Sequence, residues 1–426
     1  MQKRLYMIDL FCGAGGVSEG AIQAGFYPIF SSDISVDVEK TYVNRHNQLG
    51  LIQNYNAFFY REDIKNLNGK FILDKISKLP AINKTFDKGD IDLVFGGPSC
   101  QGFSMIGKRD KKDPRNMLFK EYIRLISEIK PKYAVMENVV GFMSFSFCDF
   151  ESLDGYIYPD GTTAPEILKR EFNLIGYKTL EPKILLASNY GVPQNRKRAI
   201  FIAYKEGQEK PNYPQPIIEV PLTLADGIKD LNEQKPTKYA MDSIKGRTIS
   251  FITNKTITRK SILNNELPFH NDIIKERFSL YQEGENTIKL RERIKLYGID
   301  ISNKPNLIAL FNDDLIVDKF KEGKVSDFEI NILLTKKNIR TKLRKDKPSN
   351  TIVTIADDYI SPFDNRTFTV RELARLQSFD DSFEFLGKRT TGGKNRQFEV
   401  PQYTQVGNAV PPLMAKAICL EIKKCL

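Results

Sequence analysis

The chain has 426 residues, of which 41% are hydrophobic and 27% are charged, so it can bury one large core and a second, smaller one. Its cysteines are scattered and form no CxxC pair, which excludes a disulfide framework and argues against a zinc site. The sequence contains no secretory signal and no apolar run of membrane-spanning length. We therefore expect a cytoplasmic protein that binds no metal and inserts into no membrane.

The net charge of +11 is concentrated in two stretches. Residues 235–260 and residues 335–347 each contain seven lysines and arginines against a single aspartate. Such clusters suit a polyanion, most simply a nucleic acid. The alternative is a pair of solvated basic surfaces, because a run of charge is usually no more than that.

The first half of the chain alternates between apolar runs typical of strands and segments with helical spacing. We expect strands at residues 4–11, 27–35, 90–97, 133–141 and 196–204, and helices at residues 17–26, 36–46, 118–130 and 164–177. Strands that alternate with helices predict a doubly wound α/β fold with a parallel sheet. In such sheets, ligands bind at the carboxyl ends of the strands.

The alternation stops after Tyr204, where a charged, proline-rich segment predicts a domain boundary. We assign residues 1–204 to a larger domain that residues 400–426 complete, and residues 205–399 to a smaller domain. Helical or strand periodicity is weak until a helix at residues 369–379. The chain ends with a turn that opens an amphipathic helix.

The first expected strand runs into the glycine-rich segment DLFCGAGG, residues 9–16. Gly13 and Gly15 let the backbone approach a ligand closely as the chain turns into a helix. Because the segment is not GxGxxG, it favours a smaller nucleoside-type ligand over a dinucleotide. Asp33 ends the second strand and Asp63 lies past the third, where they could bind a ribose and an adenine amino group. Each acid alone is more often a helix cap, but their positions at successive strand ends favour the ligand.

A second unusual turn, GGPSCQGFS at residues 96–104, places Cys100 just after a buried strand. A lone cysteine is usually a small buried hydrophobe, but in this turn its thiol can face a cleft. Nucleophilic use requires a thiolate, which nearby cations such as Arg196 and Arg198 would favour. Glu137 follows the apolar YAVM at the next strand end, so we expect it to be buried and to complete a pair of nucleophile and acid.

Six short segments, taken in order, resemble the DNA (cytosine-5)-methyltransferase family in its bacterial restriction-modification form. They are DLFCGAGG, GGPSCQGFS, ENV, QNRKR, RELARLQSF and QVGNAVPP. The resemblance runs from Asp9 to Pro412 and leaves out about residues 205–347. It implies a Rossmann-like methyltransferase sheet in a catalytic domain, a smaller target-recognition domain, S-adenosyl-L-methionine as methyl donor, and double-stranded DNA as substrate.

The resemblance implies that Cys100 adds to C6 of cytosine, which makes C5 nucleophilic enough to take a methyl group. Glu137 matches the carboxyl group that binds and protonates N3 of the base. Arg196 and Arg198 match the arginines that hold the base and orient the glutamate. One departure is Ser99, where the family most often has proline; serine leaves φ of this turn less restricted.

The cofactor contacts that the resemblance implies lie at the strand ends and near the end of the chain. They are Phe11, Gly13, Gly15, Asp33, Ile34, Asp63, Ile64, Leu118, Asn408 and Val410. Asp33 and Ile34 would meet ribose and adenine, and Asp63 and Ile64 would meet the adenine edge.

A cytosine inside a duplex cannot reach a thiolate, so the target base must swing out of the helix. Residues 105–117 carry five basic and two acidic side chains and resemble the family's loop that closes over DNA; a solvated connector is the alternative. The basic region 235–347 would form the target-recognition module, whose cations bind phosphates while a few side chains read base edges.

Other functions stay open at this point. A tRNA cytosine-5 methyltransferase would use the same motifs, although the long basic insert favours duplex DNA. A DNA-binding relative without catalysis is disfavoured by the intact catalytic motifs, and a Rossmann dehydrogenase by the lack of GxGxxG. The first turn begins within about a dozen residues of Met1, which favours the modification enzyme of a restriction-modification system. We expect a monomer, with a cognate restriction endonuclease as its functional partner.

Overall fold

The computed structural model describes residues 4–98, 117–148, 150–232, 234–334, 337–393, 395 and 398–426. The strands are β1 (Leu5–Leu10), β2 (Phe26–Asp33), β3 (Phe58–Arg61), β4 (Leu93–Gly96), β5 (Tyr133–Asn138), β6 (Tyr177–Thr179), β7 (Lys183–Leu186), β8 (Gln194–Asn195), β9 (Lys197–Lys205), β10 (Thr341–Lys342), β11 (Ser349–Asn350) and β12 (Tyr359–Ile360). The α-helices are α1 (Gly16–Ala24), α2 (Val36–Leu49), α3 (Gly69–Ser77), α4 (Leu118–Ile129), α5 (Ala164–Leu174), α6 (Leu224–Ile228), α7 (Lys238–Lys245), α8 (Asp272–Ser279), α9 (Thr287–Tyr297), α10 (Pro305–Ile308), α11 (Ile316–Lys321), α12 (Asp327–Leu333), α13 (Val370–Leu376), α14 (Gln402–Asn408) and α15 (Pro412–Lys423).

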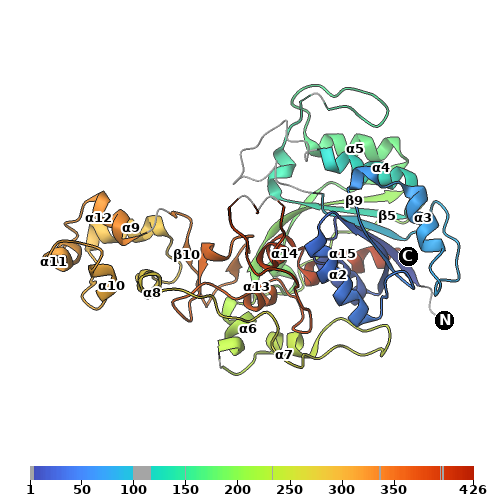
Figure 1. Ribbon diagram of the computed structural model, residues 1–426. Coiled ribbons are helices and arrows are strands. Elements are labelled where there is room, and N and C mark those ends of the chain that lie inside the picture. Colours follow the sequence, from blue (N-terminus) through green and yellow to red (C-terminus); the bar gives the residue numbers. More distant parts are fainter. Residues whose placement is uncertain are drawn as a thin grey trace.

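In the described part of the chain, eight strands form one central sheet in the order β3-β2-β1-β4-β5-β9-β6, and β7 also pairs with β9. Helices lie on both sides of this sheet (Figure 1). The doubly wound α/β fold predicted from the sequence is confirmed, and every strand and helix predicted in the first half is present within a few residues.

The expectation of an all-parallel sheet is wrong at one edge. Strands β1 to β5 pair in parallel, but β9 runs antiparallel to β5, and β6 and β7 run antiparallel to β9. A parallel pair needs a long crossover connection, usually a helix. The structure describes the whole segment between β7 and β9, and it contains no α-helix. The chain therefore turns back, and β9 runs beside β7 in the opposite direction.

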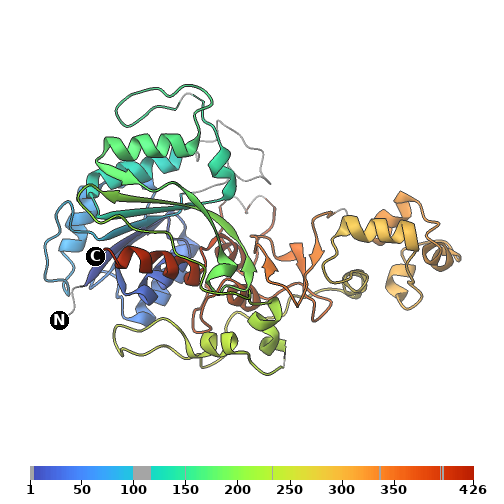
Figure 2. The ribbon, with the colours of Figure 1, turned by 180° about the vertical axis from the view of Figure 1, so that it is seen from behind.

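Both faces of the sheet are buried, because side chains on a strand point alternately to opposite sides. On β1, Ile8 and Leu10 join the core beneath α3, α4 and α5, whereas Met7 joins the core beneath α1 and α15. Figure 2 shows α15, near the end of the chain, packed against the sheet from behind. The last helix of the protein is therefore part of the same layer as the first.

Helices α1 and α15 approach each other closely because α1 carries glycine where they meet. A Cβ built on Gly20 would lie 2.3 Å from the carbonyl oxygen of Pro412, and one on Gly16 would lie 2.1 Å from that of Val410. Neither distance is compatible with a side chain. The lack of a side chain at Gly16 and Gly20 therefore allows the start of α15 to lie directly against α1.

A buried ion pair connects the sheet layer to the second half of the chain. Arg45 on α2 donates from Nε to Glu19 Oε1 on α1 over 2.6 Å, and both residues are 1% exposed. Arg45 also donates to the hydroxyl of Ser382, 3.1 Å away, and the hydroxyl of Thr248 donates to Glu19. Charges buried this deeply are stable only when paired and hydrogen-bonded, so this ion pair fixes one arrangement of the two halves.

The second half contains two further cores. One packs α6, α13 and α14 together and includes Ala14 from the first turn. The other belongs to the segment α8 to α12, which we call the helical lobe. Among the described residues, the buried members of this core lie within residues 278–334, apart from Ile360. This lobe projects away from the sheet (Figure 1). Its helices are short, α10 to α12 having four to seven residues, which is why periodicity did not predict them.

We expect Gly20→Ala to lower the free energy of unfolding, although alanine is normally the better helix former. The added Cβ must displace the backbone of α15, at a cost of roughly 1–3 kcal/mol. Urea denaturation followed by circular dichroism measures the change. Gly392→Ala is the matched control, because no atom of the described residues lies within 4 Å of its added Cβ. Equal stability of the two variants would contradict the close approach of the helices.

Candidate active site

Several described residues that the sequence singled out lie at one edge of the sheet, where the parallel strands end. The turn after β1, Asp33 at the end of β2, and Glu137 near the end of β5 all belong to this edge. Because β9 is antiparallel, its first residues also reach this edge, opposite the last residues of β5. Elements far apart in sequence therefore meet in one place.

The turn after β1 has the tight geometry that its glycines predict. Gly13 and Gly15 have φ of 52° and 97°, and Phe11 also takes a positive φ of 56°. The amide of Cys12 donates to the carbonyl of Ser32, which ties the turn to β2. Among the described residues, no atom lies within 4 Å of a Cβ built on Gly13, so they leave open space beside this residue for a ligand.

Asp33 is bound to that turn. Its Oδ2 accepts from the amide of Gly13 over 3.1 Å, and its Oδ1 accepts from the amide of Ser35 over 2.9 Å. Burial raises the pKa of Asp33, while the backbone hydrogen bonds lower it. The next residue, Ile34, is an exposed large apolar side chain, 66% accessible, beside this carboxylate. A carboxylate and an uncovered apolar side chain together suit a ribose with an attached base.

Asp63 follows β3, as predicted, and caps a short 3-10 helix by accepting from the amide of Lys65 over 3.0 Å. The preceding amide, that of Glu62, donates to the carbonyl of Asp33, so the two acids come from adjacent segments. Ile64 is buried in the large core, 5% exposed, so its side chain is already covered by protein. A ligand would meet Ile64 through its backbone.

The remaining predicted cofactor residues come from three other elements. Leu118 begins α4 and is half-buried against the core. Asn408 ends α14 and is exposed, and Val410 is buried with its carbonyl oxygen at the start of α1. The segment before α15 thus returns to the first turn, as the resemblance predicted for Val410.

Glu137 and Arg198 form an ion pair at the same edge. Arg198 Nε lies 2.7 Å from Glu137 Oε1, and the two side chains are 13% and 12% exposed. Glu137 on β5 is in register with Ile200 on β9. Arg198 lies two residues before Ile200 on the same strand, so its side chain is on the same face of the sheet as that of Ile200. Gly97 lies beside the ion pair, since its Cβ would be 3.4 Å from Glu137 Oε2. The burial of Glu137 expected from the sequence is confirmed.

Asn138 binds Pro98, the last described residue before the predicted nucleophile. The side-chain amide of Asn138, which is buried, donates to the carbonyl of Pro98 over 3.3 Å. Cys100, Ser99 and residues 105–116 of the predicted closing loop lie outside the described residues. The described part of the site thus reaches to within two residues of Cys100.

Arg196 has different partners from Arg198. It is 1% exposed, and its two terminal nitrogens donate to the carbonyls of Ile352 and Gly407 over 3.0 and 2.9 Å. It therefore joins the segment between β8 and β9 to the second half of the chain, whereas Arg198 is the arginine that pairs with the glutamate. Gln194, fully buried, makes a similar connection through the carbonyl of Leu376.

The two basic stretches are partly neutralised by acids within the protein. Arg247 and Arg259 pair with the buried Asp380 and Asp381, at 2.9 and 2.7 Å. In the second stretch, Lys337 pairs with Asp357 and Asp358, and Arg340 pairs with Asp357. The segment 272–334 between the stretches has ten lysines and arginines against twelve acids. Counting charge along the chain therefore overstates the cations available to a polyanion.

Two other kinds of site are absent from the described part of the chain. Within it, no group of three or more histidine, cysteine, aspartate and glutamate side chains could hold a metal ion. No helix within the described ranges is long and apolar enough to cross a membrane.

The strand order and the glycine-rich turn after β1 define a Rossmann-like methyltransferase fold. A crystal structure described as that of a putative DNA modification methyltransferase encoded within an E. coli prophage has this fold. It superimposes with a TM-score of 0.63 at 23% identity, over 99% of both chains.

Sequence comparison gives the family. The sequence model of the C-5 cytosine-specific DNA methylase family matches residues 5–424. Type II methyltransferase M.DdeI of Desulfomicrobium norvegicum is 31% identical over 423 residues, covering 98% of this chain and 88% of that protein. Type II methyltransferase M1.HphI of Haemophilus parahaemolyticus is 31% identical over 426 residues, covering 99% and 87%. The chain belongs to the C-5 cytosine-specific DNA methylase family and is a DNA (cytosine-5)-methyltransferase, which confirms the family inferred from the six segments.

Sequence reasoning missed several residues that support this site. Asn138 and Gln194 lie inside the motifs ENV and QNRKR but were assigned no role. A polar residue at the end of an apolar strand was the available signal for Asn138, because a buried amide must find partners. The pairing of Arg45 with Glu19 gave no signal, because the two residues lie on different helices.

We expect exposed lysines of the first basic stretch, rather than its ion-paired arginines, to contribute to DNA binding. Replacing Lys235, Lys238 and Lys245 by alanine should weaken binding and reduce the slope of log affinity against log salt by about 1 for each phosphate that is no longer neutralised. Fluorescence anisotropy with duplex DNA at several salt concentrations measures both quantities. Lys178→Ala, at the far edge of the sheet, is the control. An unchanged salt slope in the triple variant would exclude this stretch from the docking surface.

Proposed function

We propose that this enzyme transfers a methyl group from S-adenosyl-L-methionine to C5 of a cytosine that has swung out of duplex DNA, through a covalent bond between Cys100 and C6. The ion pair between Arg198 and Glu137 is the observation that carries the proposal. It places a positioned carboxyl group beside Gly97, three residues before Cys100. Nucleophilic attack on a pyrimidine needs such a group at the ring nitrogen.

Each protein residue has one task in this reaction. The Cys100 thiolate forms a bond to C6, and Glu137 supplies a proton to N3 as electrons move into the ring. Arg198 holds Glu137 in place through the 2.7 Å ion pair. After methyl transfer, a base removes the C5 proton, the bond from sulfur to C6 breaks, and N3 returns its proton to Glu137, which restores the thiolate and the carboxyl group. Arg196 is proposed to act with Arg198 on the base, on the resemblance alone.

S-adenosyl-L-methionine would supply the electrophilic methyl group. Asp33, which accepts from the amides of Gly13 and Ser35, is proposed to accept the ribose hydroxyls, and exposed Ile34 is proposed to cover the base. Asp63 has one carboxylate oxygen engaged as a cap, and it is proposed to meet the adenine edge with the other. The remaining contacts proposed are Phe11, Gly15, Ile64, Leu118, Asn408 and Val410.

The biological setting is proposed from the named relatives, which are Type II methyltransferases. We infer that this enzyme modifies a specific DNA sequence and protects it from a restriction endonuclease that cuts there. It would act as a monomer in the cytoplasm, with residues 205–399 reading the target. Bisulfite sequencing of DNA from cells that express the protein reports the modified sequence directly.

The covalent step is tested with 5-fluorocytosine at the modified position of a duplex, because fluorine at C5 blocks release of the enzyme. We expect the wild-type protein to form a complex that survives denaturing electrophoresis and Cys100→Ala to form none. Cys148→Ala, at an exposed cysteine, is the control and should be trapped like the wild type. Trapping of Cys100→Ala, or methylation of tRNA in preference to duplex DNA, would overturn the proposal.

The role of Glu137 is tested by Glu137→Gln, which keeps the shape of the side chain but cannot give a carboxyl proton. We expect the single-turnover rate to fall about 10²- to 10⁴-fold, as for loss of a general acid. DNA affinity should change far less, because the residue acts on the ring rather than on the duplex. Glu206→Gln, at an exposed position after β9, controls for loss of charge. Equal losses in rate and in DNA affinity would count against the assigned role.

A further inference from the structure

Asp9 is a buried carboxylic acid, 1% exposed, that the proposed reaction does not use. It is the next-to-last residue of β1. The hydroxyl of Ser18 on α1 donates to Asp9 Oδ2 over 2.7 Å and lies 2.7 Å from the phenol oxygen of Tyr42 on α2. Tyr42 also shares a hydrogen bond with the hydroxyl of Ser31 on β2. Asp9 therefore ends a chain of hydrogen bonds that joins two strands and two helices.

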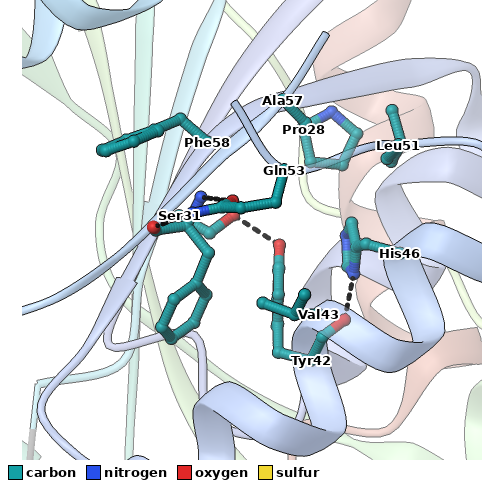
Figure 3. A pocket seen from close by; sticks show the side chains of 10 residues that line it. Pro28, Ser31, Tyr42, Val43, His46, Leu51, Gln53, Ala57 and Phe58 are labelled. Carbon is teal, nitrogen blue, oxygen red and sulfur yellow. Dashed lines mark hydrogen bonds between the residues drawn. The ribbon is translucent and has the colours of Figure 1, made fainter. Parts of the chain in front are cut away.

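Tyr42 lies directly beneath the turn after β1. A Cβ built on Gly15 would be 3.1 Å from the Tyr42 ring and 3.8 Å from His46. The rings of Tyr42 and His46 stack, with centroids 3.8 Å apart. Figure 3 shows the two rings side by side on α2, with the Tyr42 hydroxyl bonded to Ser31 beside a small cavity. The ring of Tyr42 therefore limits how closely the turn at Gly15 can approach α2.

The direction of the hydrogen bonds depends on the charge of Asp9. When Asp9 is ionised, Ser31 donates to Tyr42, Tyr42 to Ser18, and Ser18 to Asp9, so each hydrogen bond holds one proton. When Asp9 is protonated, the same three hydrogen bonds must hold a fourth proton, and one donor is left without an acceptor in the chain. The complete chain is therefore the ionised one.

We propose that Asp9 is a positioning residue of the cofactor site, which holds the turn from Cys12 to Gly15 in place through Ser18 and Tyr42. This inference rests on the proposed function, because the turn is where the cofactor would bind. Asp9 itself is 1% exposed and bonded to Ser18, so in this proposal it acts through its neighbours.

Burial raises the pKa of Asp9 to about 7; the hydrogen bond from Ser18 lowers it, and Asp33 raises it further. The titratable groups around it from the first turn, β2, α2 and α15 are Cys12, Asp33, Tyr42 and Cys419. None of these neighbours is a cation that could neutralise the carboxylate. The hydrogen-bond chain therefore changes between its two forms near neutral pH.

The sign of the expected effect follows from this titration. Above about pH 7 Asp9 is ionised, the chain is complete, and the turn is held for ligand. Below that pH one donor in the chain is unsatisfied, so the cofactor should bind more weakly. Between about pH 4 and pH 7, Asp9 holds its proton in the folded protein but has released it in the unfolded chain. The free energy of unfolding therefore decreases as pH rises through this window.

The test measures binding of S-adenosylhomocysteine by calorimetry from pH 6 to pH 8. We expect the wild-type Kd to improve about three- to tenfold over this range, as linkage to one proton allows. Asp9→Asn keeps the size and an acceptor for Ser18 but cannot ionise, so its Kd should be nearly constant. Asp92→Asn is the control: this buried carboxylate lies at the opposite edge of the sheet, paired with Lys132, and its loss should leave the wild-type pH profile.

A second readout does not depend on the ligand. The free energy of unfolding of Asp9→Asn relative to wild type should increase as pH rises from 5 to 8, because only the wild type must ionise a buried acid. A wild-type pH profile for binding in Asp9→Asn, or a constant stability difference between the two proteins, would overturn the role of Asp9. Failure of wild type to bind S-adenosylhomocysteine at any pH would instead reject the proposed function, and the stability comparison would still report on Asp9.

Discussion

The site depends on one reversal of chain direction, at the point where β9 pairs antiparallel with β5. Had β9 been parallel, its first residues would lie at the opposite edge of the sheet, and Arg198 could not reach Glu137. The reversal places an arginine from the start of one strand beside a glutamate from the end of its neighbour, at 2.7 Å. The parallel strands supply the turn after β1 and Asp33, whereas the antiparallel strand supplies the cation that pairs with Glu137.

The second half of the chain is fastened to this edge by charged and polar side chains directed inward. Arg196 reaches the carbonyls of Ile352 and Gly407, and Arg45 reaches Glu19 and Ser382. Such interactions add little net stability, because desolvation of the charges offsets their attraction. They do require one particular geometry, however, because a buried charge without its partner is strongly destabilising. The two halves are thereby set in one orientation.

The sequence predicted the sheet layer well because each strand there is buried on both faces and each helix on one, so periodicity and apolar runs carry the signal. It also located Asp33, Glu137 and the first turn, because strand ends are recognisable from where apolar runs stop. The pairing of charges could not be predicted in the same way. Arg247 and Arg259 read as surface cations until Asp380 and Asp381 are found against them, more than a hundred residues further along.

The helical lobe formed by α8 to α12 has an apolar core of its own, to which Ile360 also belongs, and backbone hydrogen bonds join residues 284–287 of the lobe to Arg340 and Lys342. Because packing changes are felt mainly by neighbours in the same cluster, substitutions inside the apolar core of the lobe should disturb packing mainly within the lobe. The lobe and the sheet therefore share no apolar cluster among the described residues. A change of side-chain volume inside the lobe should for this reason cost the sheet less than the same change made inside the sheet.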